Sequence, residues 1–317
     1  MKQRGLFFYP YVPLSISRNS HKSELSSDFK GIILLSTNRL ETYKWQIGTS
    51  LPLAVIAGCN VLENLDESLT VGRELKSICE DLGLPYAFKA SFDKANRSSI
   101  KSFRGPGLTA GLEMLREIKA ALNVPLCTDI HEVEQAEHVA EHVEIVQIPA
   151  FLCRQTDLVT AIAQAAKLHG NAIHVKKAQF LAPWDCKNIL SKIRETAPEA
   201  PIYLCERGTS FGYNNLIVDP LAMPEMHKLG VPVTIDATHA VQLPGADPRT
   251  GGASTGGRRD GVAMIAKAAV ATGADGVFLE FHSDPDAALC DAPSCLPITA
   301  ARELLTTLSA IRGIINN

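Results

Sequence analysis

The chain has no apolar run long enough to cross a bilayer, although 46% of its 317 residues are hydrophobic. We therefore expect no transmembrane helix. The chain also lacks an excess of one charge, because its formal net charge is −3 and its pI is near 6.3. Nucleic acids and membrane surfaces need a dominant basic face, so this balance argues against both as partners.

Closely spaced cysteine pairs and a secretory segment are also missing. The eight cysteines are scattered along the chain, which predicts reduced thiols in a cytosolic protein. Residues 1–42 show no sustained helical or strand period, so we expect an N-terminal extension that is disordered or loosely packed. A transit peptide is the alternative for this basic, Ser-containing start, but Glu24, Asp28 and the lack of an Arg-rich helix weaken it.

From residue 53 onward, short apolar runs alternate with amphipathic segments. The expected strands are residues 53–57, 86–90, 125–129, 145–148, 172–176, 202–206, 233–236 and 276–281. The expected helices are residues 67–82, 109–122, 132–141, 157–168, 185–195, 260–272 and 299–311. This alternation predicts an α/β fold, a closed (β/α)8 TIM barrel over residues 43–317, in preference to an open doubly wound sheet. A short strand pair near residues 43–50 is expected to cap the barrel bottom.

Polar residues recur at or just past the ends of the predicted strands. They are Asn60, Lys89, Asp129, Gln147, Lys176, Arg207, His239 and Glu280. One such residue is commonly a helix cap or a turn residue. A succession of eight is hard to explain by capping, and the carboxyl ends of barrel strands carry the active site in this fold.

The most basic part of the chain is the segment 88–107, which ends in Gly-Pro-Gly. It contains Lys89, Lys94, Arg97, Lys101 and Arg104, and Asp93 is its only acidic residue. We interpret the segment as an anion-binding loop whose partner is an external dianion. The alternative is a solvated basic loop.

Two further cations follow strands. Lys176 and Lys177 are neighbours at a strand end, so one of them must point into the barrel, and we assign Lys176 to the inside. The guanidinium of Arg207 is suited to grip a phosphate or carboxylate with two parallel hydrogen bonds. The alternative for Arg207 is an ion pair with Glu206.

His239, Glu280, His282 and Asp291 are expected to cluster after the last two strands. Two imidazoles and two carboxylates suit either a divalent metal or proton transfer. A cysteine (59, 290 or 295) as fourth ligand would favour a transition metal, but we prefer the metal-free alternative. Alternation along the strand places Asn60, and not its neighbour Cys59, at the site.

The Gly-rich segment 241–260 follows the seventh strand. We interpret it as a lid that closes over a phosphorylated substrate and excludes water. A flexible surface insertion is the alternative on composition alone.

From about residue 53 to the C-terminus, the chain resembles the 3-deoxy-D-manno-octulosonate 8-phosphate (KDO 8-phosphate) synthase family. The matching motifs are AGCNVLEN, FKASFDKANRSS, FRGPG, TDIHE, QIPAFLCRQTD, VKKAQF, ERGTSFGYNNL and DATHAVQ. The resemblance implies condensation of phosphoenolpyruvate with arabinose 5-phosphate, for lipopolysaccharide biosynthesis, by a homotetramer without a cofactor. It also implies that Arg97 and Ser98 reach into a neighbouring subunit's site.

The resemblance also implies roles for individual residues. Phosphoenolpyruvate would be bound by Lys89, Ser91, Lys94, Gln147, Ala150 (through its backbone), Lys176 and Arg207. The sugar phosphate would be held by Asn96, Arg97 and Ser98, and His239, Glu280 and Asp291 would surround the reacting centre. We expect Asn60 and Asp291 to orient the sugar hydroxyls, and His239 or Lys94 to transfer a proton.

Asn60 carries the expectation of metal independence, because metal-requiring members of that family have cysteine at its position. The sequence departs from the family at Ala292, where glycine is usual, and at Cys59. The alternatives are a metal-dependent heptulosonate 7-phosphate synthase, a Schiff-base aldolase using Lys176, and a catalytically silent sugar-phosphate sensor. The first is disfavoured by Asn60 and by the KANRSS loop, and the last by the intact charged positions.

Overall fold

The computed structural model describes residues 40, 43, 45–245, 251 and 255–316. Nearly all of the predicted N-terminal extension lies outside the described residues, and so does most of the centre of the predicted lid. The fold and the pocket lie in the described part of the unit formed by residues 33–317.

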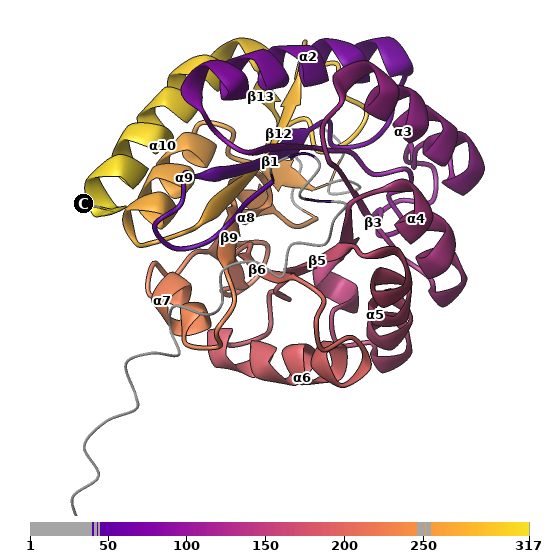
Figure 1. Ribbon diagram of the computed structural model, residues 1–317. Coiled ribbons are helices and arrows are strands. Elements are labelled where there is room, and N and C mark those ends of the chain that lie inside the picture. Colours follow the sequence, from indigo (N-terminus) through magenta and orange to yellow (C-terminus); the bar gives the residue numbers. More distant parts are fainter. Residues whose placement is uncertain (1–39, 41–42, 44, 246–250, 252–254, 317) are drawn as a thin grey trace, which may run out of the picture. The chain divides into compact units, whose positions relative to one another are not determined.

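Eight parallel strands close into a barrel because β1 pairs with both β2 and β12 (Figure 1). The strands are β1 (Ala54–Gly58), β2 (Tyr86–Lys89), β3 (Leu126–Asp129), β4 (Ile145–Ile148), β5 (Ala172–Lys176), β6 (Ile202–Glu206), β9 (Val233–Asp236) and β12 (Gly276–His282). All eight predicted strands are confirmed. Almost every strand residue is buried, as expected for a parallel sheet covered on both faces.

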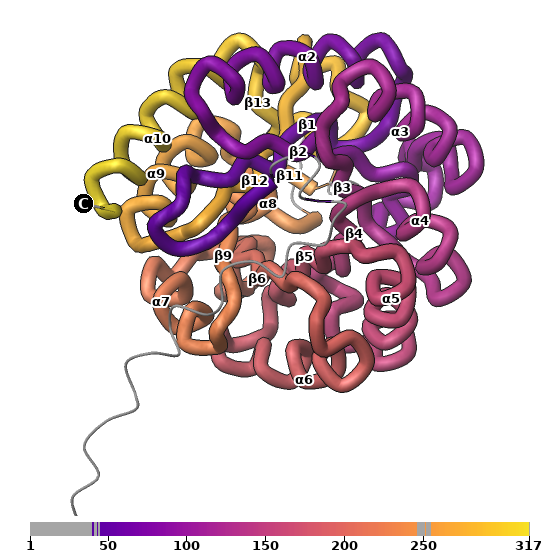
Figure 2. The backbone as a smooth tube through the Cα atoms, in the orientation of Figure 1, coloured from indigo at the N-terminus to yellow at the C-terminus, as the bar shows by residue number. Residues whose placement is uncertain are grey.

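Helices form a layer outside the strands, as the backbone tube in Figure 2 shows. They are α2 (Leu65–Leu82), α3 (Leu108–Leu122), α4 (Ala136–His142), α5 (Thr156–His169), α6 (Lys187–Thr196), α7 (Ala222–His227), α9 (Gly261–Ala271) and α10 (Ala301–Asn316). Every predicted helix is confirmed, and α7 was not predicted. In the described part of the chain, no helix combines the length and apolarity that a membrane span needs.

Shorter elements shape the end of the barrel where the strands finish. They are the helix α8 (Ala237–Ala240), the 3-10 turns η2 (Val133–Gln135), η3 (Ala150–Leu152), η4 (Pro183–Cys186) and η6 (Ile298–Ala300), and the strands β7 (Thr209–Ser210), β8 (Leu216–Ile217), β10 (Gln242–Leu243), β11 (Gly256–Gly257) and β13 (Leu296–Pro297). These small strands and α8 were not predicted.

Local signals explain where the helices begin and end. The side chain of Asn64 accepts a hydrogen bond of 2.8 Å from the backbone N–H of Glu67 and so caps the start of α2. The same helix ends at Gly83, whose φ of 66° lies in the left-handed region that favours glycine. The two acidic residues in the first turn, Asp66 and Glu67, also interact favourably with the positive end of the helix dipole.

The strand pair expected near residues 43–50 is wrong for the described residues there, which form turns and irregular backbone. Leu40 and Trp45 instead bury their side chains in the cluster that fills the barrel interior. The indole Nε1 of Trp45 donates a hydrogen bond of 3.3 Å to the Tyr203 hydroxyl. The buried apolar surface of the indole covers the barrel bottom, so no strand pair is required there.

Two helical glycines give a matched test of packing. A Cβ at Gly111 in α3 would clash with Cβ of Phe92, whereas a Cβ at Gly313 in α10 would meet nothing within 4 Å. We predict that Gly111→Ala lowers the free energy of unfolding by about 1–3 kcal/mol, because overpacking outweighs the gain in helix propensity. Gly313→Ala should raise it by about 0.5–1 kcal/mol. Urea unfolding of both variants measures this, and equal shifts would contradict the close packing of α3 on Phe92.

Candidate active site

A pocket of about 300 Å³ opens at the carboxyl ends of the barrel strands. All of the predicted site residues except Asn60 line it. They are Lys89, Ser91, Lys94, Asn96, Arg97, Ser98, Asp129, Gln147, Ala150, Lys176, Arg207, His239, Glu280 and Asp291. Residues from seven strand ends or the loops after them therefore meet in one place, because a closed parallel barrel brings all of those ends to one rim.

Lys89, at the end of β2, is neutralised within the pocket. Its Nζ lies 3.2 Å from Oδ1 of Asp129 and donates a hydrogen bond of 2.8 Å to Oγ of Ser91. Burial, opposed by the Asp129 carboxylate, lowers the pKa of Lys89. For Asp129, burial opposes ionisation, but the charges of Lys89 and His131 prevail and hold its pKa well below the usual range.

The basic loop divides into two parts. Lys89, Lys94 and Arg97 face the pocket, whereas Lys101 is exposed and Arg104 forms an exposed ion pair with Asp93. Three of the five cations of this loop therefore line the pocket, and Lys101 and Arg104 do not. The Lys101 side chain lies in solvent, and the Arg104 guanidinium pairs with the Asp93 carboxylate outside the pocket.

Arg97 and Ser98 line the pocket of their own chain. Nη1 of Arg97 contacts Sγ of Cys290, which belongs to the loop after β12. Within this chain they lie at its own pocket, and the expectation that they also reach a neighbouring subunit's site stays a prediction.

Lys176 points into the barrel, as strand alternation predicted. Its Nζ forms a buried ion pair with Oδ2 of Asp236 and lies 3.3 Å from the centre of the Phe278 ring. Lys177 points away from the pocket and pairs with Glu206 at 3.3 Å. The Lys176 amine therefore contacts both a carboxylate and the face of an aromatic ring.

Arg207 is buried but keeps an uncommitted donor. Its Nη2 donates a hydrogen bond of 3.0 Å to Oε1 of Gln242, and its buried Nη1 has no hydrogen-bond partner among the described residues. The Glu206 side chain accepts from the backbone N–H groups of Arg207 and Gly208 and pairs with Lys177, so it does not hold the guanidinium. A buried unpaired donor is costly, which favours an anionic ligand at this point.

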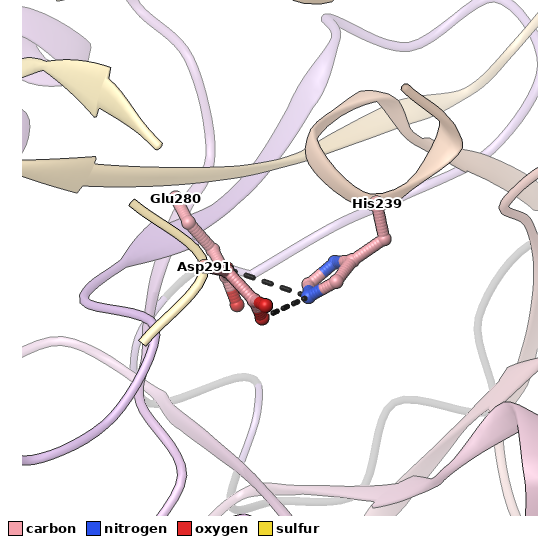
Figure 3. A group of neighbouring side chains, drawn as sticks. All are labelled: His239, Glu280 and Asp291. Atoms are coloured by element: carbon pink, nitrogen blue, oxygen red, sulfur yellow. Dashed lines mark ion pairs between the residues drawn. The ribbon is translucent and has the colours of Figure 1, made fainter. Parts of the chain in front are cut away.

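His239, Glu280 and Asp291 face one another on one wall of the pocket (Figure 3). Nε2 of His239 lies 3.5 Å from Oε2 of Glu280 and 3.7 Å from Oδ2 of Asp291. The side-chain nitrogen of Asn60 donates hydrogen bonds to the same two oxygens, that to Asp291 being 2.9 Å long. A neutral amide and an imidazole thus stand between two carboxylates that would otherwise repel each other.

Charges around this group set its protonation. Burial disfavours the imidazolium of His239, but the carboxylates of Asp236 and Glu280 outweigh burial and raise its pKa. For Asp291, burial opposes ionisation, but hydrogen bonding and charge from His239 lower its pKa. Asp291 also has a φ of 50°, which is rare for a residue with a side chain and marks backbone strain at a functional loop.

The same three residues offer ligand atoms that lie within 4.8 Å of one another, close enough for a divalent metal ion. Among the described residues, no cysteine joins this group. Cys59 is buried on the other side of its strand in the helix-facing core, as predicted, and Cys290 contacts Arg97. The three side chains could therefore hold a metal ion. The side-chain NH2 group of Asn60, however, already donates hydrogen bonds to both carboxylates, and a metal ion would have to displace it.

Two predicted neighbours of this group lie elsewhere. His282 is not part of the pocket lining, because it sits between Glu63 and Glu67 at 3.6 Å from each. The predicted lid contributes Gln242, Pro244, Gly245 and Thr255 to the lining. Most of its centre lies outside the described residues, so closure stays a prediction.

Several functional side chains were missed by sequence reasoning. Asp236 holds both Lys176 and His239. The imidazole of His131 contacts Asp129 at 2.8 Å, and Gln242 orients Arg207. Asp236 is the last residue of β9, so the strand-end rule that found the other residues could have found it.

In a comparison with known protein families, residues 27–316 match the DAHP synthetase I family. A protein from Geobacter sp. (strain M21) named 2-dehydro-3-deoxyphosphooctonate aldolase is 49% identical over 271 residues, which cover 86% of this chain and 96% of that protein. A protein of the same name from Desulfosudis oleivorans is 51% identical over 267 residues, or 84% and 92% of the two chains. Another from Trichlorobacter lovleyi is 46% identical over 279 residues, or 88% and 99%.

Asp236→Asn tests the electrostatics of this site. We predict that the pKa of His239 falls, because its strongest neighbouring charge is lost, and that unfolding becomes easier by about 3 kcal/mol, because Lys176 stays buried and unpaired. In the wild type, folding raises the pKa of His239 above 6.5. The stability that the His239 imidazolium contributes is therefore complete below pH 6.5 and is lost as the pH rises through the pKa of the folded state. The variant should show less of that alkaline loss.

NMR titration of the His239 ring and urea unfolding across pH measure both effects. An unchanged His239 pKa in the variant would show that Asp236 does not control it. Asp219→Asn, at an exposed loop position, is the control and should change neither quantity.

Proposed function

The chain belongs to the DAHP synthetase I family, and from this membership and its pocket we propose that it is a KDO 8-phosphate synthase. It would condense phosphoenolpyruvate with D-arabinose 5-phosphate and water, giving 3-deoxy-D-manno-octulosonate 8-phosphate and inorganic phosphate. This is a transferase step of lipopolysaccharide KDO biosynthesis. The relatives at 46% to 51% identity carry the synonymous name 2-dehydro-3-deoxyphosphooctonate aldolase.

One observation carries the proposal: five cations line a single pocket beside an imidazole and two carboxylates. The cations are Lys89, Lys94, Arg97, Lys176 and Arg207. The substrates bring two phosphates and a carboxylate, which match this excess of positive charge. The uncommitted Nη1 of Arg207 is the point where the structure most needs an anion.

The two substrates occupy different parts of the pocket in this proposal. Phosphoenolpyruvate binds to Lys89, Ser91, Lys94, Gln147, the Ala150 backbone, Lys176 and Arg207, with Asp129 fixing Lys89 and Ser91. The sugar phosphate binds to Asn96, Arg97 and Ser98. This arrangement directs the sugar's aldehyde carbon toward the wall formed by His239, Glu280 and Asp291.

The reaction requires a bond between C3 of phosphoenolpyruvate and the aldehyde carbon of the sugar. Water adds at C2, and phosphate leaves from that carbon with cleavage of the C–O bond. Positioning and electrostatic stabilisation by the cations account for most of the catalysis. His239, with its raised pKa, or Lys94, whose Nζ lies 4.0 Å from Oε1 of Glu280, supplies a proton to the developing alkoxide.

Metal independence is the finer part of the proposal. Asn60 donates to both Glu280 and Asp291, and this bridge, together with the neighbouring His239, lets two carboxylates lie close together without a metal ion. In this reading Asn60 and Asp291 orient the sugar's hydroxyl groups, and the enzyme needs no cofactor.

The contacts of Lys176 argue against a Schiff-base aldolase. Schiff-base formation needs a neutral amine, whereas Lys176 is ion-paired with Asp236 and lies over the Phe278 ring. Attack by the Lys176 nitrogen on a carbonyl carbon would require both contacts to break.

The homotetramer that the family resemblance implies needs subunit interfaces, and we propose that exposed aromatic side chains form one of them. Phe151, Phe180, Trp184, Phe211 and Tyr213 are 47%, 62%, 57%, 64% and 98% exposed. They lie on the loops after β4, β5 and β6, which are neighbours in the barrel, and a backbone hydrogen bond of 2.9 Å from Ser210 to Gln179 joins two of these loops. We call these five residues the aromatic patch; an apolar patch of this kind is typical of a protein interface.

Phosphate release from phosphoenolpyruvate tests both the reaction and its metal requirement. We predict release that depends on arabinose 5-phosphate and persists in excess EDTA. Arg207→Gln should lower kcat/KM by at least about 100-fold, because a charge-assisted contact to the substrate is lost in a buried site.

The outcomes separate the two parts of the proposal. Release restored only by added divalent metal would overturn metal independence and leave the reaction intact. Release with erythrose 4-phosphate, but not with arabinose 5-phosphate, would indicate a heptulosonate 7-phosphate synthase instead. Borohydride trapping of a carbonyl substrate on Lys176 would indicate the Schiff-base aldolase.

The aromatic patch predicts how the assembly responds to charge. Light scattering of the wild type should give about four times the chain mass of 34.2 kDa. The double variant Trp184→Glu/Phe211→Glu should dissociate, because desolvating carboxylates at an interface is costly. Met264→Glu on α9, at a side chain 68% exposed, is the matched control and should keep the wild-type mass. A monomeric wild type, or a double variant of unchanged mass, would refute this interface.

A further inference from the structure

His174 is a buried imidazole directly beneath the pocket floor. It is fully buried in β5, two residues before Lys176, so both side chains point into the barrel. Its ring stacks on that of Phe278, with ring centres 6.2 Å apart and an interplanar angle of 19°. An apolar residue would fill this space at lower desolvation cost, so the two ring nitrogens require an explanation.

Both ring nitrogens have a partner. Nε2 lies 2.9 Å from Oγ1 of Thr234, and Nδ1 lies 3.2 Å from Oε1 of Gln147. Gln147, at the end of β4, is the only one of these partners that also lines the pocket. The three side chains come from three different strands and form a chain that runs from the barrel interior to the proposed phosphoenolpyruvate site.

The ring is neutral and therefore has one N–H. Burial, with the charge of Lys176, lowers the pKa of His174 to about 3. The Thr234 hydroxyl has one proton, which can go to Nε2 of His174 at 2.9 Å or to the Leu204 carbonyl at 3.2 Å. Oε1 of Gln147 can only accept a hydrogen bond, so its contact with Nδ1 assigns the ring proton to Nδ1, and Nε2 then accepts from the Thr234 hydroxyl.

We infer that His174 is a positioning residue that fixes the orientation of the Gln147 side-chain amide. With its carbonyl oxygen held by the Nδ1–H of His174, Gln147 presents its NH2 group to the pocket. The opposite orientation would present a carbonyl oxygen to the anionic substrate. This inference rests on the proposed function only for the identity of the anion, because the hydrogen-bonded chain is present in the protein itself.

His174→Phe and His174→Asn test the inference. Phe keeps the ring volume without a hydrogen-bond donor, so KM for phosphoenolpyruvate should rise about fivefold, the effect of losing one hydrogen bond. Asn can place its side-chain nitrogen near the former Nδ1 and should restore most of the wild-type KM. Thr234→Val should also raise KM, because it removes the hydroxyl that holds the proton on Nδ1.

Two comparisons separate positioning from stability. Thr128→Val removes another fully buried hydroxyl, which donates a 2.7 Å hydrogen bond to the Ala90 carbonyl; this control should lower the melting temperature without changing KM. In a Gln147→Leu background, His174→Phe should have no further effect on KM. Equal KM values for the Phe and Asn variants, or a full further rise in the Gln147→Leu background, would overturn the inference.

Nitrogen NMR of the wild-type His174 ring provides a test that needs no turnover. We expect a protonated Nδ1 and an unprotonated Nε2, and the reverse assignment would overturn the inference even if the variants folded poorly. A wild type that releases no phosphate from phosphoenolpyruvate but shows this tautomer would refute the proposed reaction alone.

Discussion

Buried lysines paired with buried carboxylates are the interaction on which the rest of the site depends. Lys89 faces Asp129, Lys176 faces Asp236, and Lys94 lies near Glu280. A lysine taken out of water without such a partner would lose its proton or destabilise the fold. The carboxylates offset the charges of these three lysines, and the guanidinium groups of Arg97 and Arg207 remain as the excess charge that an anion can neutralise.

The parts of the fold that follow from repeated patterns could be predicted from the sequence. Each strand is a short apolar run because both of its faces are buried, and every site residue at a strand end follows from the geometry of a closed barrel. The same logic placed Lys176 inside and Cys59 outside. The family resemblance added the residues of the loop after β2, for which strand geometry offers no rule.

Features that depend on a competition between distant partners could not be predicted. Arg104 forms an ion pair with Asp93 and does not line the pocket. His282 likewise lies beside Glu63 and Glu67 and not in the pocket. The bottom of the barrel is closed by the indole of Trp45 and its contact with Tyr203, which are 158 positions apart. The sequence predicted that residues near 43–50 cover the bottom of the barrel. It could not distinguish a strand pair from a buried side chain as the covering structure.

The barrel interior changes in character from one end to the other, and this gradient explains why a substrate site can be both rigid and charged. At the bottom, Ala54, Ala87 and Cys127 pack against Trp45 in an apolar cluster. Above it, Phe278 provides an apolar surface that contacts charged or polar groups on its open side, including Lys176 and His239. His174 lies at this boundary, with a ring that stacks like an aromatic residue and nitrogens that bond like a polar one. Packing from below therefore limits the movement of groups whose charges face the pocket, and this is the preorganisation that electrostatic catalysis requires.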